Sequence, residues 1–242
     1  MLHLKNNLQK IAGKLMDILY PLQCISCNQK VDSAHSFCQK CWSKVEFIGK
    51  PCCEKCSIPL PVDYLGRRCY KCVSHPPKFD VCISVFRYDD FTKKLIHDFK
   101  FNDKTGYAKS FAHMMYNQSG QLLEQADVVI PVPMHKTRVQ RRKYNHATLI
   151  ARNISKLSGV KLEVDALIKL RPSVNQMGLN RLERARNLLG AFSVSDDSLI
   201  RNKSIVLVDD VLTTGATASE CAKTLKQFGA KKIIVLTAAR TY

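Results

Sequence analysis

From about residue 79 to its end, the chain alternates short apolar runs with segments whose apolar residues recur every three or four positions. Runs rich in Val, Ile and Phe predict β-strands, and they cover 79–88, 126–133, 166–170, 204–210 and 231–239. Helical spacing and capping residues predict helices over 91–101, 107–118, 146–159, 180–190 and 217–229. This alternation predicts an α/β domain with a parallel sheet flanked by helices.

The first 22 residues have a different pattern. Their apolar residues stand at helical spacing, at Leu4, Leu8, Ile11, Leu15 and Ile18, and predict an amphipathic helix that ends before Pro21. We expect it to pack against protein, with attachment to a membrane surface through its lysines as the alternative. No run reaches the ~18 apolar residues of a membrane span, and the uninterrupted apolar centre of a signal peptide is missing. We therefore expect a cytoplasmic protein without a transmembrane segment.

Nine of the eleven cysteines lie within residues 24–72. Eight of them form four C-x-x-C pairs, Cys24/Cys27, Cys38/Cys41, Cys53/Cys56 and Cys69/Cys72. Because each such turn holds two thiolates on one side of a tight loop, two turns close a tetrahedron around Zn²⁺, at about 2.3 Å per sulfur. The pattern predicts two structural zinc sites, each with four cysteine ligands, in a double zinc ribbon over residues 23–76, followed by the α/β domain over 77–242.

Sequence order favours pairing the first two turns with each other and the last two with each other. The loops between paired turns, ten and twelve residues long, are shorter than the usual ribbon spacing. A crossed pairing, or substitution of a ligand by His35, His75 or Cys52, therefore stays open. The two cysteines outside the cluster, Cys82 and Cys221, are expected to be small buried apolar residues.

The chain is strongly basic, with 38 Lys and Arg against 20 Asp and Glu, a net charge of +18. Such a charge favours a polyanionic partner. Residues 128–162 contain no acidic residue, which predicts a surface for single-stranded DNA, with a solvated basic face as the alternative. The candidate nucleic-acid residues are Arg141, Arg142, Lys143, Tyr144, Arg181 and Arg184, of which the tyrosine offers a ring for stacking.

The apolar run 204–210 ends in two adjacent carboxylates, Asp209 and Asp210. Ligands of parallel sheets sit at the carboxyl ends of strands. The residues of the following turn are Val211, Leu212, Thr213, Thr214, Gly215, Ala216 and Thr217. A glycine, hydroxyls and the free N–H groups of the next helix bind phosphate, whereas paired carboxylates accept hydrogen bonds from vicinal hydroxyls and help to anchor Mg²⁺. The pattern predicts a site for a phosphorylated ribose, and the absence of G-x-x-x-x-G-K-[ST] disfavours a Walker-type site.

The sequence VLVDDVLTTGAT resembles the phosphoribosyl-pyrophosphate (PRPP) signature of the type I phosphoribosyltransferases. The four cysteine pairs and the segments LIHDFKF, VIPVPMHKTRVQRRKYNHA and VNQMGLNRLERARNLLGAF extend the resemblance to the ComF/GntX family, nearly end to end. This resemblance implies a type I phosphoribosyltransferase-like sheet, PRPP or a related phosphorylated sugar as the ligand with Mg²⁺, and a role in natural competence, the uptake of single-stranded DNA. A competence helicase or another DNA-processing protein is then an expected partner.

Whether such a protein catalyses a reaction stays open. Pyrophosphate candidates follow the strand at 126–133, and they are His135, Lys136 and Arg138, with membership of the general basic surface as the equal alternative. No acceptor site is recognisable, and the zinc ribbons occupy the usual place of the covering hood. An active phosphoribosyltransferase that releases pyrophosphate is therefore the alternative to a DNA-binding competence factor. A third reading is a PRPP sensor that regulates partner binding.

Overall fold

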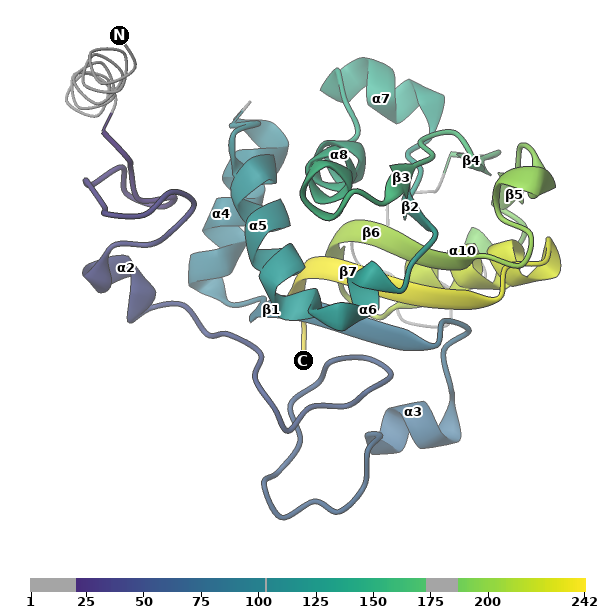
Figure 1. Cartoon of the computed structure of the whole chain (residues 1–242), viewed down its shortest axis with the longest axis horizontal. Coiled ribbons are helices and arrows are strands. Elements are labelled where there is room, and N and C mark those ends of the chain that lie inside the picture. The colour runs from purple at the N-terminus through teal and green to yellow at the C-terminus, as the bar shows by residue number, and fades with distance from the viewer. Residues whose placement is uncertain (1–20, 103, 173–186) are drawn as a thin grey trace, which may run out of the picture. The chain divides into compact units, whose positions relative to one another are not determined.

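The computed structural model describes residues 21–102, 104–172 and 187–242 (Figure 1). The chain divides into two compact units, residues 1–44 and 45–242. The second cysteine cluster thus shares a unit with the α/β sheet, while the first cluster belongs to the other unit. This division falls elsewhere than the expected boundaries after residues 22 and 76, which stay predictions. The expected N-terminal helix lies outside the described residues.

A five-stranded parallel sheet, with strand order β1-β7-β6-β2-β3, forms the centre of the larger unit. Its strands are β1 (Val81–Arg87), β2 (Val128–Pro131), β3 (Lys161–Leu162), β6 (Ser204–Leu212) and β7 (Lys232–Arg240). A separate antiparallel pair is formed by β4 (Leu167–Lys169) and β5 (Phe192–Val194). The prediction of an α/β fold with a parallel sheet flanked by helices is confirmed. The short strands β3 and β5 were not predicted, because two or three residues carry no periodicity.

The longer helices follow the predicted positions closely, and four short helices are added. They are α2 (Gln39–Trp42), α3 (Tyr70–Ser74), α4 (Asp90–Phe101), α5 (Tyr107–Ser119), α6 (Gln121–Glu124), α7 (Lys136–Arg142), α8 (His146–Ser158) and α10 (Ala216–Gln227), with a 3-10 turn at Asp197–Leu199. Asn145 caps α8 by accepting from Ala147 N, and Gly159 ends the helix with a left-handed φ of 74°. The added helices are α2, α3, α6 and α7, of which α7 lies in the basic stretch. The helix expected over 180–190 lies largely outside the described residues.

The core lies on both faces of the sheet. On one face, Ile205 and Leu207 of β6 pack in a buried cluster with Leu225 of α10. The same cluster contains Cys82 and Cys221, which are buried as expected for isolated cysteines. Helices α5 and α8 pack against the sheet through β1, β2, β6 and β7. Burial on both faces explains why β6 is an almost continuous apolar run rather than an alternating one.

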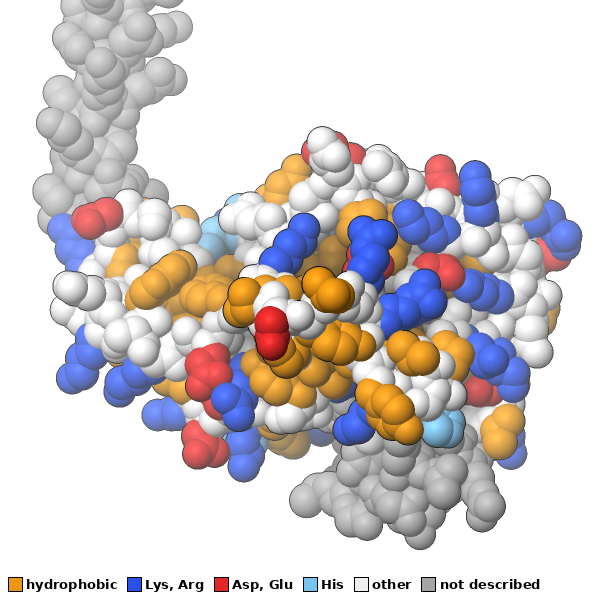
Figure 2. All heavy atoms as spheres, turned by 90° about the horizontal axis from the view of Figure 1, so that it is seen from below, with side chains coloured by type: hydrophobic (Ala, Val, Ile, Leu, Met, Phe, Trp, Pro, Cys, Tyr) orange, Lys and Arg blue, Asp and Glu red, His pale blue; other side chains and the backbone are white. Residues whose placement is uncertain are grey.

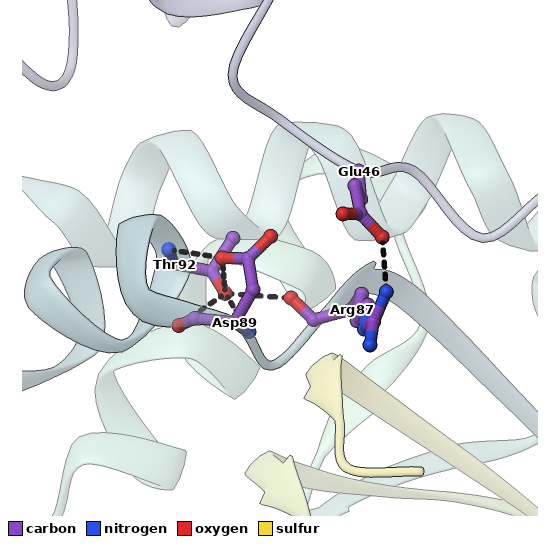
Figure 3. A network of polar contacts seen from close by, with 4 residues as sticks. All are labelled: Glu46, Arg87, Asp89 and Thr92. Atoms are coloured by element: carbon purple, nitrogen blue, oxygen red, sulfur yellow. Dashed lines mark hydrogen bonds and ion pairs between the residues drawn. The ribbon is translucent and has the colours of Figure 1, made fainter.

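Local hydrogen bonds fix the direction in which α4 leaves β1 (Figure 3). The Asp89 side chain accepts from Thr92 N at 2.8 Å, and Thr92 Oγ1 accepts from Asp89 N, so the two residues form a capping box. Thr92 Oγ1 also donates to the Arg87 carbonyl at 2.6 Å, and Arg87 pairs with Glu46 at 2.8 Å. These contacts orient α4, and its last turn carries Lys100 to the carboxyl edge of the sheet.

Within the described part of the chain, no helix combines the length and the apolar character that crossing a bilayer requires.

Candidate functional site

The eight paired cysteines form two tetrads. Cys24, Cys27, Cys38 and Cys41 make the first, and Cys53, Cys56, Cys69 and Cys72 make the second, with all sulfurs of a tetrad within 4.8 Å of one another. The Cys27 and Cys38 sulfurs are 3.6 Å apart, and those of Cys56 and Cys69 are 3.7 Å apart. A tetrahedral zinc site with bonds of about 2.3 Å needs sulfur separations of about 3.8 Å. The residues therefore fit two four-cysteine zinc-ribbon sites, paired in sequence order, and none of the alternative ligands belongs to either group.

The acidic doublet lies inside β6 rather than at its end. The strand continues through Val211 and Leu212, which pair with Ala239 and Arg240 of β7. The turn before α10 is therefore shorter than the predicted one and consists of Thr213, Thr214 and Gly215. The pattern predicted that this strand ends at Asp210, before its actual end at Leu212, because an acidic pair is typical of the end of a buried strand. Both carboxylates still lie at the carboxyl edge of the sheet.

Two lysines accompany the doublet. Lys100 Nζ lies 2.9 Å from Asp210 Oδ1, and both side chains are largely buried. Burial by itself would lower the pKa of Lys100, but Asp210 raises it above the ordinary value. Burial and the charge of Arg138 lower the pKa of Lys169 of β4, although this lysine lies close enough to Asp209 for the carboxylate to act in the opposite direction. In the sequence, Lys100 stands out only as part of the segment LIHDFKF, and nothing there points to Lys169.

Asp209 is an unusual carboxylic acid. Burial and, secondarily, the neighbouring Asp210 raise its pKa to about 7. Its Oδ1 accepts a hydrogen bond from Asp210 N at 2.9 Å. The doublet thus holds one lysine-paired carboxylate and one carboxyl group that titrates near neutral pH. Vicinal hydroxyls that donate to this pair favour the ionised state of Asp209.

The turn after β6 has the features of an anion site. Gly215 caps α10 with φ of 78°, a left-handed conformation that glycine adopts without strain. A Cβ there would meet only Leu212 Cδ1 at 3.9 Å, so φ rather than space requires the glycine. The Thr214 hydroxyl accepts from Ala216 N at 3.3 Å. The first N–H groups of this 12-residue helix, and its positive dipole end, face the turn.

The pyrophosphate candidates are at the same edge of the sheet, because they follow β2, the neighbour of β6. His135 caps the short helix α7, and its Nδ1 lies 2.9 Å from Thr137 Oγ1. Lys136 and Arg138 are exposed. Arg138 lies near Lys169, whose pKa it lowers in addition to the effect of burial. The His135 ring is engaged in capping, whereas Arg138 acts on the charge of Lys169.

The nucleic-acid candidates are partly assembled. The Arg142 guanidinium lies over the Phe101 ring at 4.7 Å, Lys143 is exposed at the end of α7, and the Tyr144 ring is 5.1 Å from that of His146. Phe101 is 57% exposed and also contacts the His97 ring at 4.7 Å. The side chain of Arg141, and Arg181 and Arg184 as a whole, lie outside the described residues. The sequence missed Phe101, which reads there as the last apolar residue of α4.

His146, at the start of α8, is buried, with 1% of its surface exposed. Within the described part of the chain, neither ring nitrogen has a hydrogen-bond partner. Burial lowers the pKa of His146, and the charge of Arg142 lowers it further. The ring is therefore neutral at pH 7, and packs edge-on against Phe99 at 4.8 Å.

A cavity of about 1030 Å³ lies beside the turn. The second zinc ribbon forms one wall, with Ile58 and Tyr70, and Thr213, Thr214 and Gly215 form part of the other. Arg240 and the C-terminal residues Thr241 and Tyr242 complete that side. The second ribbon and the turn thus line the same cavity.

Together, the parallel sheet, the acidic doublet and the threonine–glycine turn define a protein of the phosphoribosyltransferase class. The chain matches the model of the phosphoribosyl transferase domain over residues 108–241, more than half of its length, and it belongs to that family. It also matches the double zinc ribbon domain over residues 15–73. The combination confirms the resemblance to the ComF/GntX family.

Several known proteins are similar over most of their length. The chain is 27% identical over 228 residues to "Competence protein F" of Haemophilus influenzae, covering 91% of this chain and 98% of that protein. It is 27% identical over 227 residues to "DNA utilization protein YhgH" of Escherichia coli K12, with the same two coverages. Identity to "Competence protein ComFC" of Bacillus subtilis is 26% over 198 residues, covering 79% of this chain and 78% of that protein.

Proposed function

We propose that this protein is a ComF-type competence factor that handles single-stranded DNA during natural transformation, and that it binds PRPP with Mg²⁺ at the acidic doublet and the turn after it. The observation that carries the proposal is the placement of the doublet, its ion-pair partner Lys100 and the Thr213–Gly215 turn at one edge of a parallel sheet. The names of the relatives, which refer to competence and DNA utilization, support the DNA-handling role.

The chemistry of PRPP matches the groups in the site. Asp209 and Asp210 accept hydrogen bonds from the 2- and 3-hydroxyls of the ribose, and Lys100 holds Asp210 in position. The hydroxyls of Thr213, Thr214 and Thr217, with the N–H groups at the start of α10, hold the 5-phosphate. Lys136 and Arg138 face the pyrophosphate. Mg²⁺, when bound with PRPP, neutralises pyrophosphate charge, and the doublet contributes to holding it.

The test of the pocket is a calorimetric titration of the zinc-loaded protein with PRPP and Mg²⁺, repeated with a single-stranded oligonucleotide present. We expect saturable binding of one PRPP per chain, and weaker binding of ribose 5-phosphate, which lacks the pyrophosphate. If neither PRPP nor ribose 5-phosphate gives a heat of binding, the protein has no such pocket and this part of the proposal is wrong. A change of PRPP affinity in the presence of DNA would support the reading that the pocket senses PRPP and regulates DNA binding.

For DNA, we propose a surface formed by α7 and the end of α4. The basic residues of α7 neutralise phosphates, and Phe101, held by Arg142, provides the exposed ring on which a base stacks. The scarcity of aromatic residues in the sequence, 8%, therefore does not exclude stacking, because one well-placed ring is enough for one base. Binding is expected to be dominated by charge and to show little sequence preference.

We expect Phe101→Ala to weaken binding of a single-stranded oligonucleotide by roughly tenfold, because stacking on an aromatic ring is worth about 1–3 kcal/mol per base. The slope of log K against log salt should stay the same, since no phosphate contact is lost. Arg142→Ala should make the slope less steep by about 0.7, the value for one phosphate contact with single-stranded nucleic acid. Fluorescence anisotropy at several salt concentrations measures both.

Phe228→Ala is the matched control, because Phe228 is another partly exposed phenylalanine at the end of a helix, α10. Its oligonucleotide affinity should equal that of the unmodified protein. If the Phe101→Ala variant binds the oligonucleotide as tightly as the unmodified protein does, the end of α4 does not bind bases. A binding constant independent of salt would contradict the DNA surface as a whole.

The cavity between the second ribbon and the turn favours a second candidate function, transfer of phosphoribose to an acceptor. Its walls are mainly apolar, with the Tyr70 ring on one side, so they suit a planar group next to the sugar site. In this reading the purified protein with Mg²⁺ and PRPP releases pyrophosphate when the acceptor is present. Pyrophosphate release measured against a panel of bases, nucleosides and amines tests it, and binding of PRPP without release by any of them would favour the binding protein.

The second ribbon also offers a surface to a protein partner. Its exposed apolar and aromatic residues are Val62, Tyr64, Leu65, Tyr70 and Val73. Figure 2 shows hydrophobic side chains gathered in the middle of the face seen from below, with lysines and arginines around them. We propose that a competence helicase or another DNA-processing protein docks there. We also place the protein in the cytoplasm, where a reducing environment keeps the eight thiols available to zinc.

A further inference from the structure

Arg240 occupies a central position at the carboxyl edge of the sheet. It is the last residue of β7 and lies in register with Arg87 of β1 on one side and Leu212 of β6 on the other. Its side chain is buried, with 7% exposed. A cation at such a position needs partners for its N–H groups, since an unpaired buried charge is strongly unfavourable.

The partners of Arg240 come from two places far apart in the sequence. Its Nη1 donates to the carbonyl of Leu212 at 3.0 Å and to the carbonyl of Thr213, so it holds the point at which β6 becomes the phosphate-binding turn. Its Nε donates to the carbonyl of Cys56 at 3.0 Å, a ligand of the second zinc site. One guanidinium therefore joins the second zinc ribbon to the turn.

The same part of the ribbon is attached to β1 by further hydrogen bonds. The Ser57 hydroxyl donates to the Cys82 carbonyl at 2.7 Å and accepts from Ser84 N at 3.1 Å, and both contacts are buried. Lys55 Nζ donates to the Phe79 carbonyl at 2.6 Å. The turn that carries Cys53 and Cys56 is thus fixed to the sheet, and its carbonyls have defined positions as long as the ribbon keeps its shape.

Charge adds to this geometry. Zinc sites bind thiols as thiolates, so the four-cysteine site with its metal carries 2 − 4 = −2. That charge lies on the ribbon whose Cys56 carbonyl accepts from the Arg240 guanidinium, and it stabilises the buried cation. Loss of the metal removes both the negative charge and the fixed shape of the Cys53–Cys56 turn.

We propose that Arg240 is a positioning residue that couples the zinc state of the second ribbon to the conformation of the Thr213–Gly215 turn, and so to phosphosugar affinity. With zinc bound, the guanidinium holds the Leu212 and Thr213 carbonyls and keeps the turn ready for phosphate. When the metal is lost, the turn loosens and phosphosugar binding weakens. The last step rests on the proposed function; the coupling between ribbon and turn does not.

The coupling is tested by hydrogen exchange of residues 212–217 in the full-length chain. We expect Arg240→Leu to speed exchange of these amides at least about fivefold, and Arg240→Lys to have a smaller effect, because lysine keeps the charge but lacks the fork. The double substitution Cys69→Ser with Cys72→Ser, which removes metal from the second ribbon, should speed exchange in the same way. Arg87→Leu is the matched control, as it removes the neighbouring arginine in the same row of the sheet and should leave residues 212–217 unchanged.

The consequence for the ligand is tested by linkage. If zinc in the second ribbon raises PRPP affinity, PRPP with Mg²⁺ must slow loss of that zinc by the reciprocal amount. Release of metal to a chromogenic chelator should therefore become about tenfold slower for one zinc per chain when PRPP is saturating, and the first ribbon's zinc serves as the internal reference. In the Arg240→Leu variant, which is expected to keep both metals, PRPP should no longer slow the release. A merely structural arginine would change stability without removing this linkage.

The outcomes separate the inference from the proposed function. Exchange of residues 212–217 that is unaffected both by Arg240→Leu and by loss of the second zinc would overturn the coupling, whatever PRPP does. Exchange that responds as expected, in a chain that does not bind PRPP, would support the coupling and contradict the proposed ligand. Equal sensitivity of these amides to Cys24→Ser with Cys27→Ser, which empties the first ribbon, would also count against Arg240, since its contact is with the second.

Discussion

Asp209→Asn is expected to stabilise the folded protein at pH 8 while weakening PRPP binding by roughly 100-fold, as charged hydrogen bonds are worth about 1.5–3 kcal/mol each. Burial and Asp210 raise the pKa of Asp209 to about 7. The folded state therefore holds this proton more tightly than the unfolded state does. The stability that the protonated group contributes is complete below about pH 4 and is lost as the pH rises towards 7. The amide removes the cost of ionising the buried group, and the gain at pH 8 is on the order of 2 kcal/mol.

Asp210→Asn should also weaken PRPP binding, yet it should destabilise the fold. Asp210 is the ion-pair partner of Lys100 at 2.9 Å. Because the Lys100 side chain is only 23% exposed, its charge is left without its partner in a poorly hydrated place, which costs about 2 kcal/mol. Neighbouring residues with the same side chain are thus expected to change stability in opposite directions.

Urea unfolding at pH 5 and pH 8, with calorimetric titration of PRPP and Mg²⁺, measures both effects. The chain supplies a matched control in another acidic doublet, Asp196 and Asp197, where Asp196 caps the 3-10 turn and Asp197 pairs with Arg201. Substitutions there should cost stability without changing PRPP affinity. Unchanged PRPP affinity in both Asp209→Asn and Asp210→Asn would show that the doublet does not bind the sugar. A loss of stability in Asp209→Asn at pH 8 would show that the carboxylate is better accommodated than its burial indicates.

Much of this site could be predicted because its chemistry is local in the sequence. The doublet, the turn and the first residues of α10 are consecutive, so a buried strand followed by hydroxyls and glycine places them together. The cysteine tetrads were equally accessible, since each C-x-x-C turn already contains half of a site. The helices of the α/β domain followed from their periodicity and from caps such as Asn145.

The residues that the sequence did not reveal act over long separations. Lys100 meets Asp210 only because α4 crosses to the carboxyl edge of the sheet, 110 positions away in the chain. Arg240 joins Cys56 to Thr213 from the end of β7, where it reads as one of many arginines. Phe101 reads as a core residue, and only the end of α4 exposes it. Periodicity records which face of an element is buried, but it does not record which other element that face meets.

We expect Cys56→Ser to lower the zinc content from two ions per chain to one and to reduce the melting temperature by about 10 °C or more. The apolar cluster of the second ribbon is small: it consists of Cys53, Cys56 and Cys72, with Ile58, Leu60 and Cys69 packed against them. Most of these residues are cysteine ligands of the zinc. Without the metal, therefore, little buried apolar surface remains to stabilise the folded ribbon. Because the ribbon is bonded to β1 and β7, its loss also exposes the sheet edge.

Cys52→Ser is the matched control, as Cys52 is adjacent to a ligand but belongs to neither tetrad. Metal analysis should find two zinc ions in this variant, and its melting temperature should change little. The first ribbon can be followed separately, because the only tryptophan of the chain, Trp42, is next to its ligand Cys41. The fluorescence of Trp42 should change in the Cys41→Ser variant and stay unchanged in the Cys56→Ser variant. Two zinc ions in the Cys56→Ser variant would mean that a neighbouring group replaces the lost sulfur, and the pairing of ligands in sequence order would then be insufficient to define the second site.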